Sequence, residues 1–206
     1  MKLLIISYLF ILSFGLFGDE LPDLETFQRQ LSGKLVKVTS IQSDFLVNRE
    51  MPSLKLKFEF TGRLACDIEA SRLLWRVVKP IPCAFRWQDG ELSHWDGATG
   101  KILTISAGNL PWLKLLQEHL GQWLSGDLPA LRKEAEIALV AANRVRLTPT
   151  GGLLATFAAA VEIEFSDDLT RIAQIRIDEK SGDSMTIFFR NTILNQPIPA
   201  TAWELQ

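Results

Sequence analysis

The sequence has little of the residue types that would indicate polar or metal-based chemistry. It contains one tyrosine against twelve phenylalanines and six tryptophans, so its aromatic surface favours apolar ligands over sugars. The two histidines, His94 and His119, show no metal-ligand spacing with each other or with the cysteines. A Gly-x-Ser-x-Gly nucleophile motif is also absent. We therefore expect a protein that is not an enzyme and that needs neither a metal nor a cofactor.

The sequence also has no large excess of positive or negative charge. The formal net charge is −2, with 22 basic and 24 acidic side chains, so we expect no nucleic-acid partner. The two cysteines, Cys66 and Cys83, allow at most one disulfide, which suits an exported protein. A bridge between them and two separate buried thiols are both compatible with their positions.

Only one apolar run approaches the length of a membrane span. Lys2 precedes the uncharged segment LLIISYLFILSFGLFG, and Asp19 and Glu20 follow it. This order is typical of a secretory signal peptide cleaved near Gly18, although an uncleaved anchor would have a similar run. We therefore expect residues 1–18 to be a signal peptide and residues 19–206 to form a single exported domain.

The clearest pattern in the chain runs from Leu54 to Trp95. Leu56, Phe58 and Phe60 alternate with charged residues, which predicts a strand with one apolar face. Cys83, Phe85 and Trp87 alternate again in the same way, and residues 73–78 and 92–95 are predicted as further strands of the same stretch. Prolines and Asp89-Gly90 supply turns between these segments. The stretch predicts an antiparallel meander whose apolar face must be covered by helices, a second sheet or a ligand.

Helical periodicity appears in residues 23–40, from Asn109 into the Leu-rich segment that follows, and in residues 128–134. Further strands are predicted for residues 41–47, 101–106, 137–141, 144–148, 157–165, 171–178 and 184–190. The tail after Asn195 carries two prolines and is expected to be extended and docked. We expect a mainly β (α+β) fold, with a strongly curved antiparallel sheet of about eleven strands forming an incomplete barrel. The N-terminal helix and the helical insertion would serve as plug or lid.

A series of short motifs stands in a recognisable order along the chain. An amphipathic helix runs into LSGKLVKVTSIQSDF, residues 31–45. There follow, in order, Gly62-x-Leu64, Leu74-Trp75, Pro80, Asp89-Gly90 and Trp95. The chain ends with MTIFFRNTILNQPIP, residues 185–199. This order and spacing resemble the LolA family, the periplasmic carriers of outer-membrane lipoproteins, over almost the whole chain after residue 18.

The resemblance implies a periplasmic carrier that shields the acyl chains of a lipoprotein or another lipid in a hydrophobic cavity. Such a carrier, expected to be a monomer, passes its cargo from the inner membrane toward the outer membrane. It would therefore work with an inner-membrane loading complex and an outer-membrane acceptor. An alternative function for the same curved sheet is a periplasmic interaction or sensor domain that binds a polypeptide or a lipoprotein.

One position departs from the family pattern. LolA proteins usually carry an Arg-Pro pair shortly before the tryptophan of the aromatic strand, and this arginine latches the lid. Glu69 and Ala70 occupy the corresponding positions here, and Arg72 is the nearest arginine. Arg72 is therefore a candidate latch, unless the protein has none, and the departure leaves the identity of the cargo open.

The lining of the expected cavity follows from the alternating strands. The candidate ligand-binding residues are Leu56, Phe58, Phe60, Trp75, Phe85, Trp87, Val161, Ile163, Phe165, Ile187 and Phe189. The candidate lid residues are Leu113, Leu116, Leu120 and Trp123. An ordinary core would need the same side chains, so the pattern predicts a filled and an open interior equally well. Glu162 and Glu164 alternate with apolar neighbours and are predicted to lie on the solvated face rather than to form a catalytic pair.

Overall fold

The structure is a computed structural model that describes residues 21–34, 38–105, 113–114, 118–119, 123 and 128–205. The expected signal peptide, residues 1–18, and the expected lid residues Leu116 and Leu120 lie outside the described residues. Within the described part of the chain, no helix combines the length and the apolar character needed to cross a membrane.

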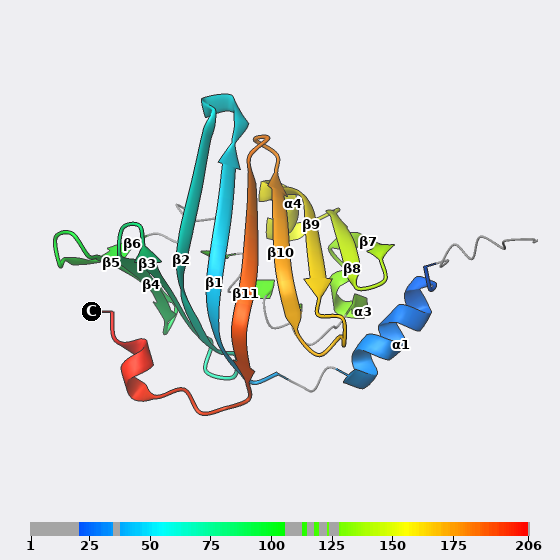
Figure 1. Ribbon diagram of the computed structural model, residues 1–206, viewed down its shortest axis with the longest axis horizontal. Coiled ribbons are helices and arrows are strands. Elements are labelled where there is room, and N and C mark those ends of the chain that lie inside the picture. The colour runs from blue at the N-terminus through cyan, green and yellow to red at the C-terminus, as the bar shows by residue number, and fades with distance from the viewer. Residues whose placement is uncertain are drawn as a thin grey trace, which may run out of the picture.

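Eleven antiparallel strands make up most of the part of the chain that the structure describes (Figure 1). They are β1 (Ser40–Met51), β2 (Leu56–Asp67), β3 (Arg72–Lys79), β4 (Cys83–Gln88), β5 (Glu91–Asp96), β6 (Ile102–Ile105), β7 (Ala135–Ala141), β8 (Arg144–Pro149), β9 (Ala158–Phe165), β10 (Ile172–Glu179) and β11 (Ser184–Leu194). The helices among the described residues are α1 (Leu24–Lys34), α3 (Leu128–Leu131) and α4 (Gly152–Phe157), with the 3-10 turns η1 (Pro52–Leu54) and η3 (Ala200–Trp203).

The strands form one open sheet in the order β6-β5-β4-β3-β2-β1-β11-β10-β9-β8-β7. Strands β1 to β6 form a meander in which each strand pairs with the next. Strands β7 to β11 form a second meander, and β11 pairs with the free side of β1. Because the two ends of the order are not paired with each other, the barrel is incomplete. The predicted mainly β fold with about eleven strands is confirmed.

Strand alternation gives the sheet an inner face that carries the main core. Phe45 on β1 lies opposite Gly62 on β2 and Phe189 on β11, so these positions share the inner face. Helix α1 buries Phe27 and Leu31 against this face, and the Phe27 ring centre lies 6.1 Å from that of Phe165. Leu128 of α3 and Leu154 of α4 belong to the same core cluster.

Two predicted boundaries are wrong. Helix α1 spans Leu24–Lys34 and does not reach residue 40, because β1 begins at Ser40 and Val38, just before it, is buried in the core. The segment Gly152–Phe157 is helical, although no helix was predicted there and a strand was expected to begin at residue 157. The helical turn buries the apolar side chain of Leu154 in the core. An extended chain in this segment would give that side chain a different direction.

The outer face of β2–β5 is covered by the C-terminal tail (Figure 1). Trp203 and Leu205 pack with Ala65, Leu74 and Ala84 in a second, smaller apolar cluster. The tail is docked as expected, but it contains the short helix η3. Side chains on the sheet also hold its backbone. The guanidinium of Arg86 donates a hydrogen bond to the Trp203 carbonyl at 3.3 Å, and that of Arg76 donates to the Glu204 carbonyl.

The outer face of β8–β10 is polar instead. Glu162 and Glu164 on β9 pair with Arg146 and Arg144 on β8, each with a nitrogen-to-oxygen distance of 2.6 Å. Both glutamates are therefore bound to arginines on the outer face, as predicted, and take no part in the inner surface.

Candidate functional site

An apolar cleft of about 240 Å³ lies on the inner face where β2, β3 and β4 run side by side. Its lining residues are Phe60, Trp75, Val77, Pro80, Ile81, Cys83 and Phe85. Every one of them is aliphatic or aromatic apart from the cysteine. The strand register explains how they meet, since Trp75 lies opposite Phe85 and Val77 lies opposite Cys83. Such a surface can bind hydrocarbon but offers little to a polar ligand.

The floor of the cleft depends on a glycine in β2. The Phe45 ring stacks on Trp75 with ring centres 3.8 Å apart and meets Phe60 edge to face at 6.5 Å. A Cβ atom at Gly62 would lie 2.4 Å from the Cζ atom of Phe45 and 1.9 Å from the carbonyl oxygen of Arg76. The absence of a side chain at Gly62 therefore lets Phe45 lie across the strand and reach Trp75.

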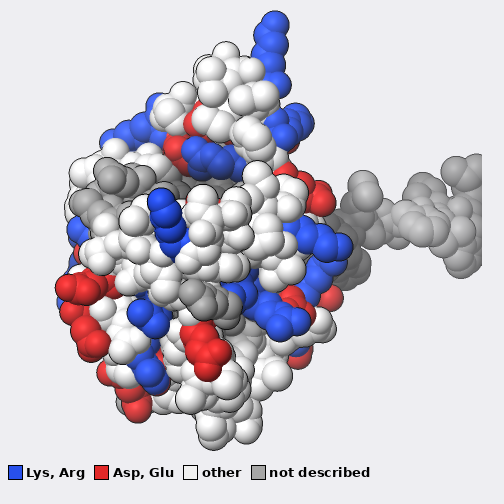
Figure 2. Space-filling model, turned by 90° about the vertical axis from the view of Figure 1, so that its left-hand side faces the viewer, with Lys and Arg blue, Asp and Glu red and all other residues white. Residues whose placement is uncertain are grey.

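Apolar side chains continue from the cleft into solvent. Ile81, in the connection between β3 and β4, is 68% exposed, and Phe58, two residues along β2 from Phe60, is 49% exposed. Leu56 is exposed further along the same side of β2. Figure 1 places the β1–β2 hairpin at the top of the molecule, and Figure 2 shows its tip standing above the face at the β6 end. Large exposed apolar side chains next to an apolar cleft are typical of a surface that binds lipid or protein.

The other predicted lining residues lie in different surroundings. Val161, Ile163, Phe165 and Ile187 are fully buried in the core cluster. Trp87 and Phe189 are half-buried and pack against that cluster. From the expected lid, Leu113 and Trp123 are fully buried in it as well. The structure thus brings Phe60, Trp75 and Phe85 together in the cleft, with Leu56 and Phe58 beyond it.

Sequence reasoning missed four residues of the cleft. Val77 and Cys83 continue the alternation of Trp75 and Phe85, so the period-two pattern could have included them. Pro80 and Ile81 had no such signal, because the segment between β3 and β4 was interpreted only as a break between strands. Pro80 and Ile81 reach the cleft because the connection between β3 and β4 folds back against the strands, which local sequence does not indicate.

Arg72, the candidate latch, lies on the outer side of the sheet. Its Nη2 atom lies 3.2 Å from Oδ2 of Asp67, and its guanidinium carbon lies 4.4 Å from the centre of the Trp203 ring. Trp203 belongs to the outer cluster, whereas Leu113 and Trp123 belong to the inner one. These contacts associate Arg72 with the C-terminal tail.

The remaining candidates for chemistry are packed against aromatic rings or buried. His94 stacks on Phe85 with ring centres 4.7 Å apart, and His119 stacks on Trp123. Among the residues that the structure describes, no three His, Cys, Asp or Glu side chains gather where they could hold a metal ion. Cys66 and Cys83 are free thiols. Burial raises the pKa of Cys66 to about 12 and also raises the pKa of Cys83.

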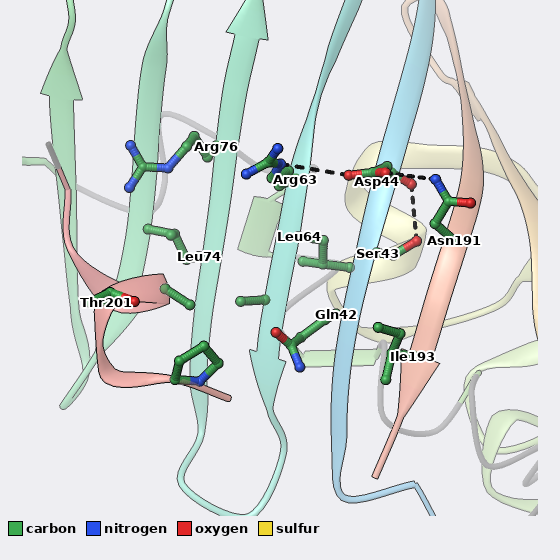
Figure 3. A pocket seen from close by; sticks show the side chains of 13 residues that line it. Gln42, Ser43, Asp44, Arg63, Leu64, Leu74, Arg76, Asn191, Ile193 and Thr201 are labelled. Atoms are coloured by element: carbon green, nitrogen blue, oxygen red, sulfur yellow. Dashed lines mark hydrogen bonds and ion pairs between the residues drawn. The ribbon is translucent and has the colours of Figure 1, made fainter. Parts of the chain in front are cut away.

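A second cavity, of about 660 Å³, lies on the outer face beside the docked tail (Figure 3). Its lining comes from β1, β2, β3, β11 and the tail: Gln42, Ser43, Asp44, Arg63, Leu64, Ala65, Leu74, Arg76, Asn191, Ile193, Pro199, Thr201 and Ala202. Unlike the inner cleft, it combines charged and apolar groups. No sequence pattern indicated it, because the tail that forms one of its walls is remote in sequence from the strands.

No protein-family model matches the chain, and no curated protein matches its sequence. Solved structures do match its fold. A DUF1329 family protein from Desulfovibrio piger aligns with 88% of this chain and 98% of its own, with a TM-score of 0.50 and 11% identity. An uncharacterized conserved protein from Thermus thermophilus covers 86% of this chain and 90% of its own, with a TM-score of 0.50 and 9% identity.

A LolA superfamily protein from Nitrosomonas europaea also matches, over 87% of this chain and 96% of its own, with a TM-score of 0.42 and 11% identity. The chain shares its overall fold with the Desulfovibrio piger and Thermus thermophilus proteins. At such low identities the likeness concerns the fold alone, so the function of this chain has to be argued from its own surfaces.

Proposed function

We propose that this protein is a periplasmic carrier that holds an acyl chain of a lipoprotein or another lipid against the inner face of its sheet. The single observation that carries the proposal is the apolar cleft between β2, β3 and β4, which continues into exposed Phe58 and Ile81. Transferring one methylene from water into an apolar site is worth roughly 0.8 kcal/mol, so a sixteen-carbon chain gains on the order of 12 kcal/mol. A lipid crossing an aqueous compartment therefore needs such a host.

The size of the cleft defines what it would hold. Small-molecule sites usually enclose about 300–1,000 Å³. At about 240 Å³, the cleft would take one part of an acyl chain. The remainder of the chain would lie along Phe58 and Leu56 on β2, which are exposed on the same side of that strand. The buried half of the inner face, around Ile163 and Ile187, would serve as the rigid support of the cleft.

Transfer from the inner membrane toward the outer membrane is the further part of the proposal. It rests on the signal-like segment of residues 1–18 and on the LolA-like order of motifs. The chain carries no phosphate-binding motif that could use a nucleotide, so loading would depend on an inner-membrane complex and release on an outer-membrane acceptor.

The experiment that tests the cleft compares two charge substitutions at exposed aliphatic residues. Ile81→Asp places a carboxylate in the cleft, and Val140→Asp places one on β7, at the far end of the sheet. Both side chains are exposed, so neither substitution empties the core. We expect Ile81→Asp to weaken binding of a fluorescent fatty acid by about tenfold or more, because the apolar contact is replaced by a charge that must be desolvated. Val140→Asp should bind as the unmodified protein does.

Native mass spectrometry of the protein purified from its own periplasm provides the matching observation on natural cargo. A stoichiometric acyl compound, released by denaturation, would support the carrier. Equal binding by both variants would show that the cleft is not the site. A protein that is empty and also fails to take up the fluorescent fatty acid would reject the carrier in favour of an interaction or sensor domain.

A further inference from the structure

The outer-face cavity has features of a binding site that are separate from the inner cleft. Its volume of about 660 Å³ falls within the range of small-molecule sites. Figure 3 shows Arg76, Arg63 and Asp44 in a row along one side, with Leu74 and Thr201 on the other. Two arginines and one aspartate give the lining a net charge of +1. The cavity thus offers a cationic side and a less polar side within one space.

The two arginines of the cavity lie side by side on neighbouring strands. Arg63 on β2 and Arg76 on β3 are direct partners in the strand register, on the same face of the sheet. Like charges directly opposite each other on neighbouring strands destabilise a sheet. The docked tail compensates one of them, because the Arg76 guanidinium donates hydrogen bonds to the carbonyl oxygens of Glu204 and Leu205. An anion placed between the arginines would compensate both.

Arg63 is held loosely enough to take a new partner. Its Nε atom lies 3.7 Å from Oδ1 of Asp44, and the two side chains are 78% and 48% exposed. Ion pairs this exposed contribute little, about 0–1 kcal/mol. Asp44 has a second partner, since the Asn191 side-chain amide donates a hydrogen bond to its other carboxylate oxygen at 2.9 Å. Asp44 would therefore keep a partner if Arg63 turned toward a ligand.

We propose that this cavity binds a small amphipathic molecule whose anionic group, a carboxylate or a phosphate, is held by Arg63 beside Arg76. Guanidinium groups match both kinds of oxyanion through paired hydrogen bonds. The apolar part of the ligand contacts Ile193, which is half exposed, and the Pro199 and Ala202 side chains of the tail. This proposal concerns the outer face and does not depend on the acyl-chain cleft.

The experiment uses NMR titration of the mature chain with hexanoate and with hexyl phosphate, and with hexanol as a neutral probe of equal chain length. We expect both anions to shift the backbone amide signals of Ala65, Leu74 and Thr201, and hexanol to leave them in place. If only one of the two anions acts, that result identifies which oxyanion the site takes. Arg63→Gln should weaken binding about tenfold or more, because it removes the charged hydrogen-bond donor.

Lys57→Gln is the matched control. Lys57 lies on the same strand as Arg63, is 79% exposed, and is paired with a partly exposed glutamate. The Lys57→Gln substitution removes the same charge from the protein as Arg63→Gln. Because Lys57 lies outside the cavity, binding of the anions should be unchanged. If both substitutions weakened anion binding equally, the cause would be the overall charge of the protein, and the proposal would be overturned. It would also be overturned if hexanol acted like hexanoate, or if all shifts mapped to Phe60 and Phe85. That last result would leave the inner cleft intact as a lipid site.

Discussion

At the scale of single residues, the absence of a side chain at Gly62 matters as much as any side chain in the cleft. A methyl group there would meet the Arg76 carbonyl at 1.9 Å, and a backbone atom in a paired strand cannot move away cheaply. We expect Gly62→Ala to lower the free energy of unfolding by about 1–3 kcal/mol, the usual cost of overpacking. Urea denaturation followed by tryptophan fluorescence measures this loss.

Gly33 gives the control for that substitution. A Cβ atom at Gly33, in the last turn of α1, would meet no atom of the described residues within 4 Å. Gly33→Ala should therefore stabilise the protein slightly, by about 0.5–1 kcal/mol, because alanine restricts the unfolded chain and favours the helix. If Gly62→Ala were equally harmless, the contact between Phe45 and Trp75 would not depend on the glycine.

The two thiols are expected to differ in reactivity. Burial raises the pKa of Cys66 to about 12, so at pH 8 only about one molecule in ten thousand carries the reactive thiolate. Cys83 is half-buried in the lining of the cleft, and partial burial also raises its pKa. We expect iodoacetamide at pH 8 to alkylate Cys83 slowly and Cys66 only after unfolding, as peptide mapping would show. Raising the pH should accelerate the reaction of Cys83, because the raised pKa leaves the thiol mostly protonated below it.

Occupancy of the cleft can be read from the same reaction. A bound acyl chain would cover Cys83, so saturating fatty acid should slow its alkylation several-fold. The Cys83→Ser variant, which should show no alkylation in the folded state, identifies the modified residue. An unchanged rate in the presence of bound fatty acid would place the lipid elsewhere on the protein.

At the scale of elements, the C-terminal tail acts as a cover for the outer face of β2–β5. Trp203 buries its ring against the sheet beneath the Arg72 guanidinium. We expect Trp203→Ala to cost about 3 kcal/mol of stability, from lost burial together with a cation–π contact of about 0.5–1 kcal/mol. The tail after Asn195 should then become sensitive to limited proteolysis.

Trp203→Phe is the control, because phenylalanine keeps an aromatic ring on the same surface. It should retain most of the stability and leave the tail resistant to protease. Protease resistance in Trp203→Ala as well would mean that the carbonyl contacts of Arg76 and Arg86 hold the tail without the ring.

The elements themselves were largely predictable from local pattern. Strands such as β2 and β4 alternate large apolar and polar residues, so one face of each was evident without knowledge of its neighbours. Helix α4 was not, because Gly152–Phe157 is short and its apolar residues fit either period. In this segment, helix is favoured over strand by the burial of Leu154 in the core, which is a tertiary contact that the local sequence does not encode.

At the scale of the whole molecule, the two halves of the inner face are covered differently. Around β9 and β10, α1 and other buried side chains fill the space above Phe165. Around β2–β4, the apolar surface continues into the cleft and solvent. Unpaired apolar surface is costly in water, so a ligand that covers it should stabilise the entire domain.

Removal of bound lipid should therefore lower the midpoint of thermal unfolding. A ligand present at a hundred times its dissociation constant stabilises the folded state by about 2.7 kcal/mol. For a chain of this length, that corresponds to a shift of roughly 5–10 °C. Differential scanning calorimetry of delipidated protein with and without fatty acid tests this. The Ile81→Asp variant should show a much smaller shift, and an equal shift in both proteins would exclude the cleft as its source.

The sequence by itself determined which side chains could face inward. Alternation depends only on the geometry of a strand, and therefore Phe60, Trp75 and Phe85 were identifiable as one apolar face. The ion-paired outer position of Glu162 and Glu164 followed from the same geometry.

Only the tertiary structure decided which of those inward side chains are covered. Ile163 and Phe85 have the same kind of pattern, yet one is fully buried in the core and the other lines the cleft. The difference comes from helices and connections that are distant in sequence and whose packing is not encoded in strand periodicity. The outer-face cavity likewise exists only because the tail crosses strands more than a hundred residues earlier in the chain. Local pattern sets the direction of a side chain, and long-range packing sets what it meets.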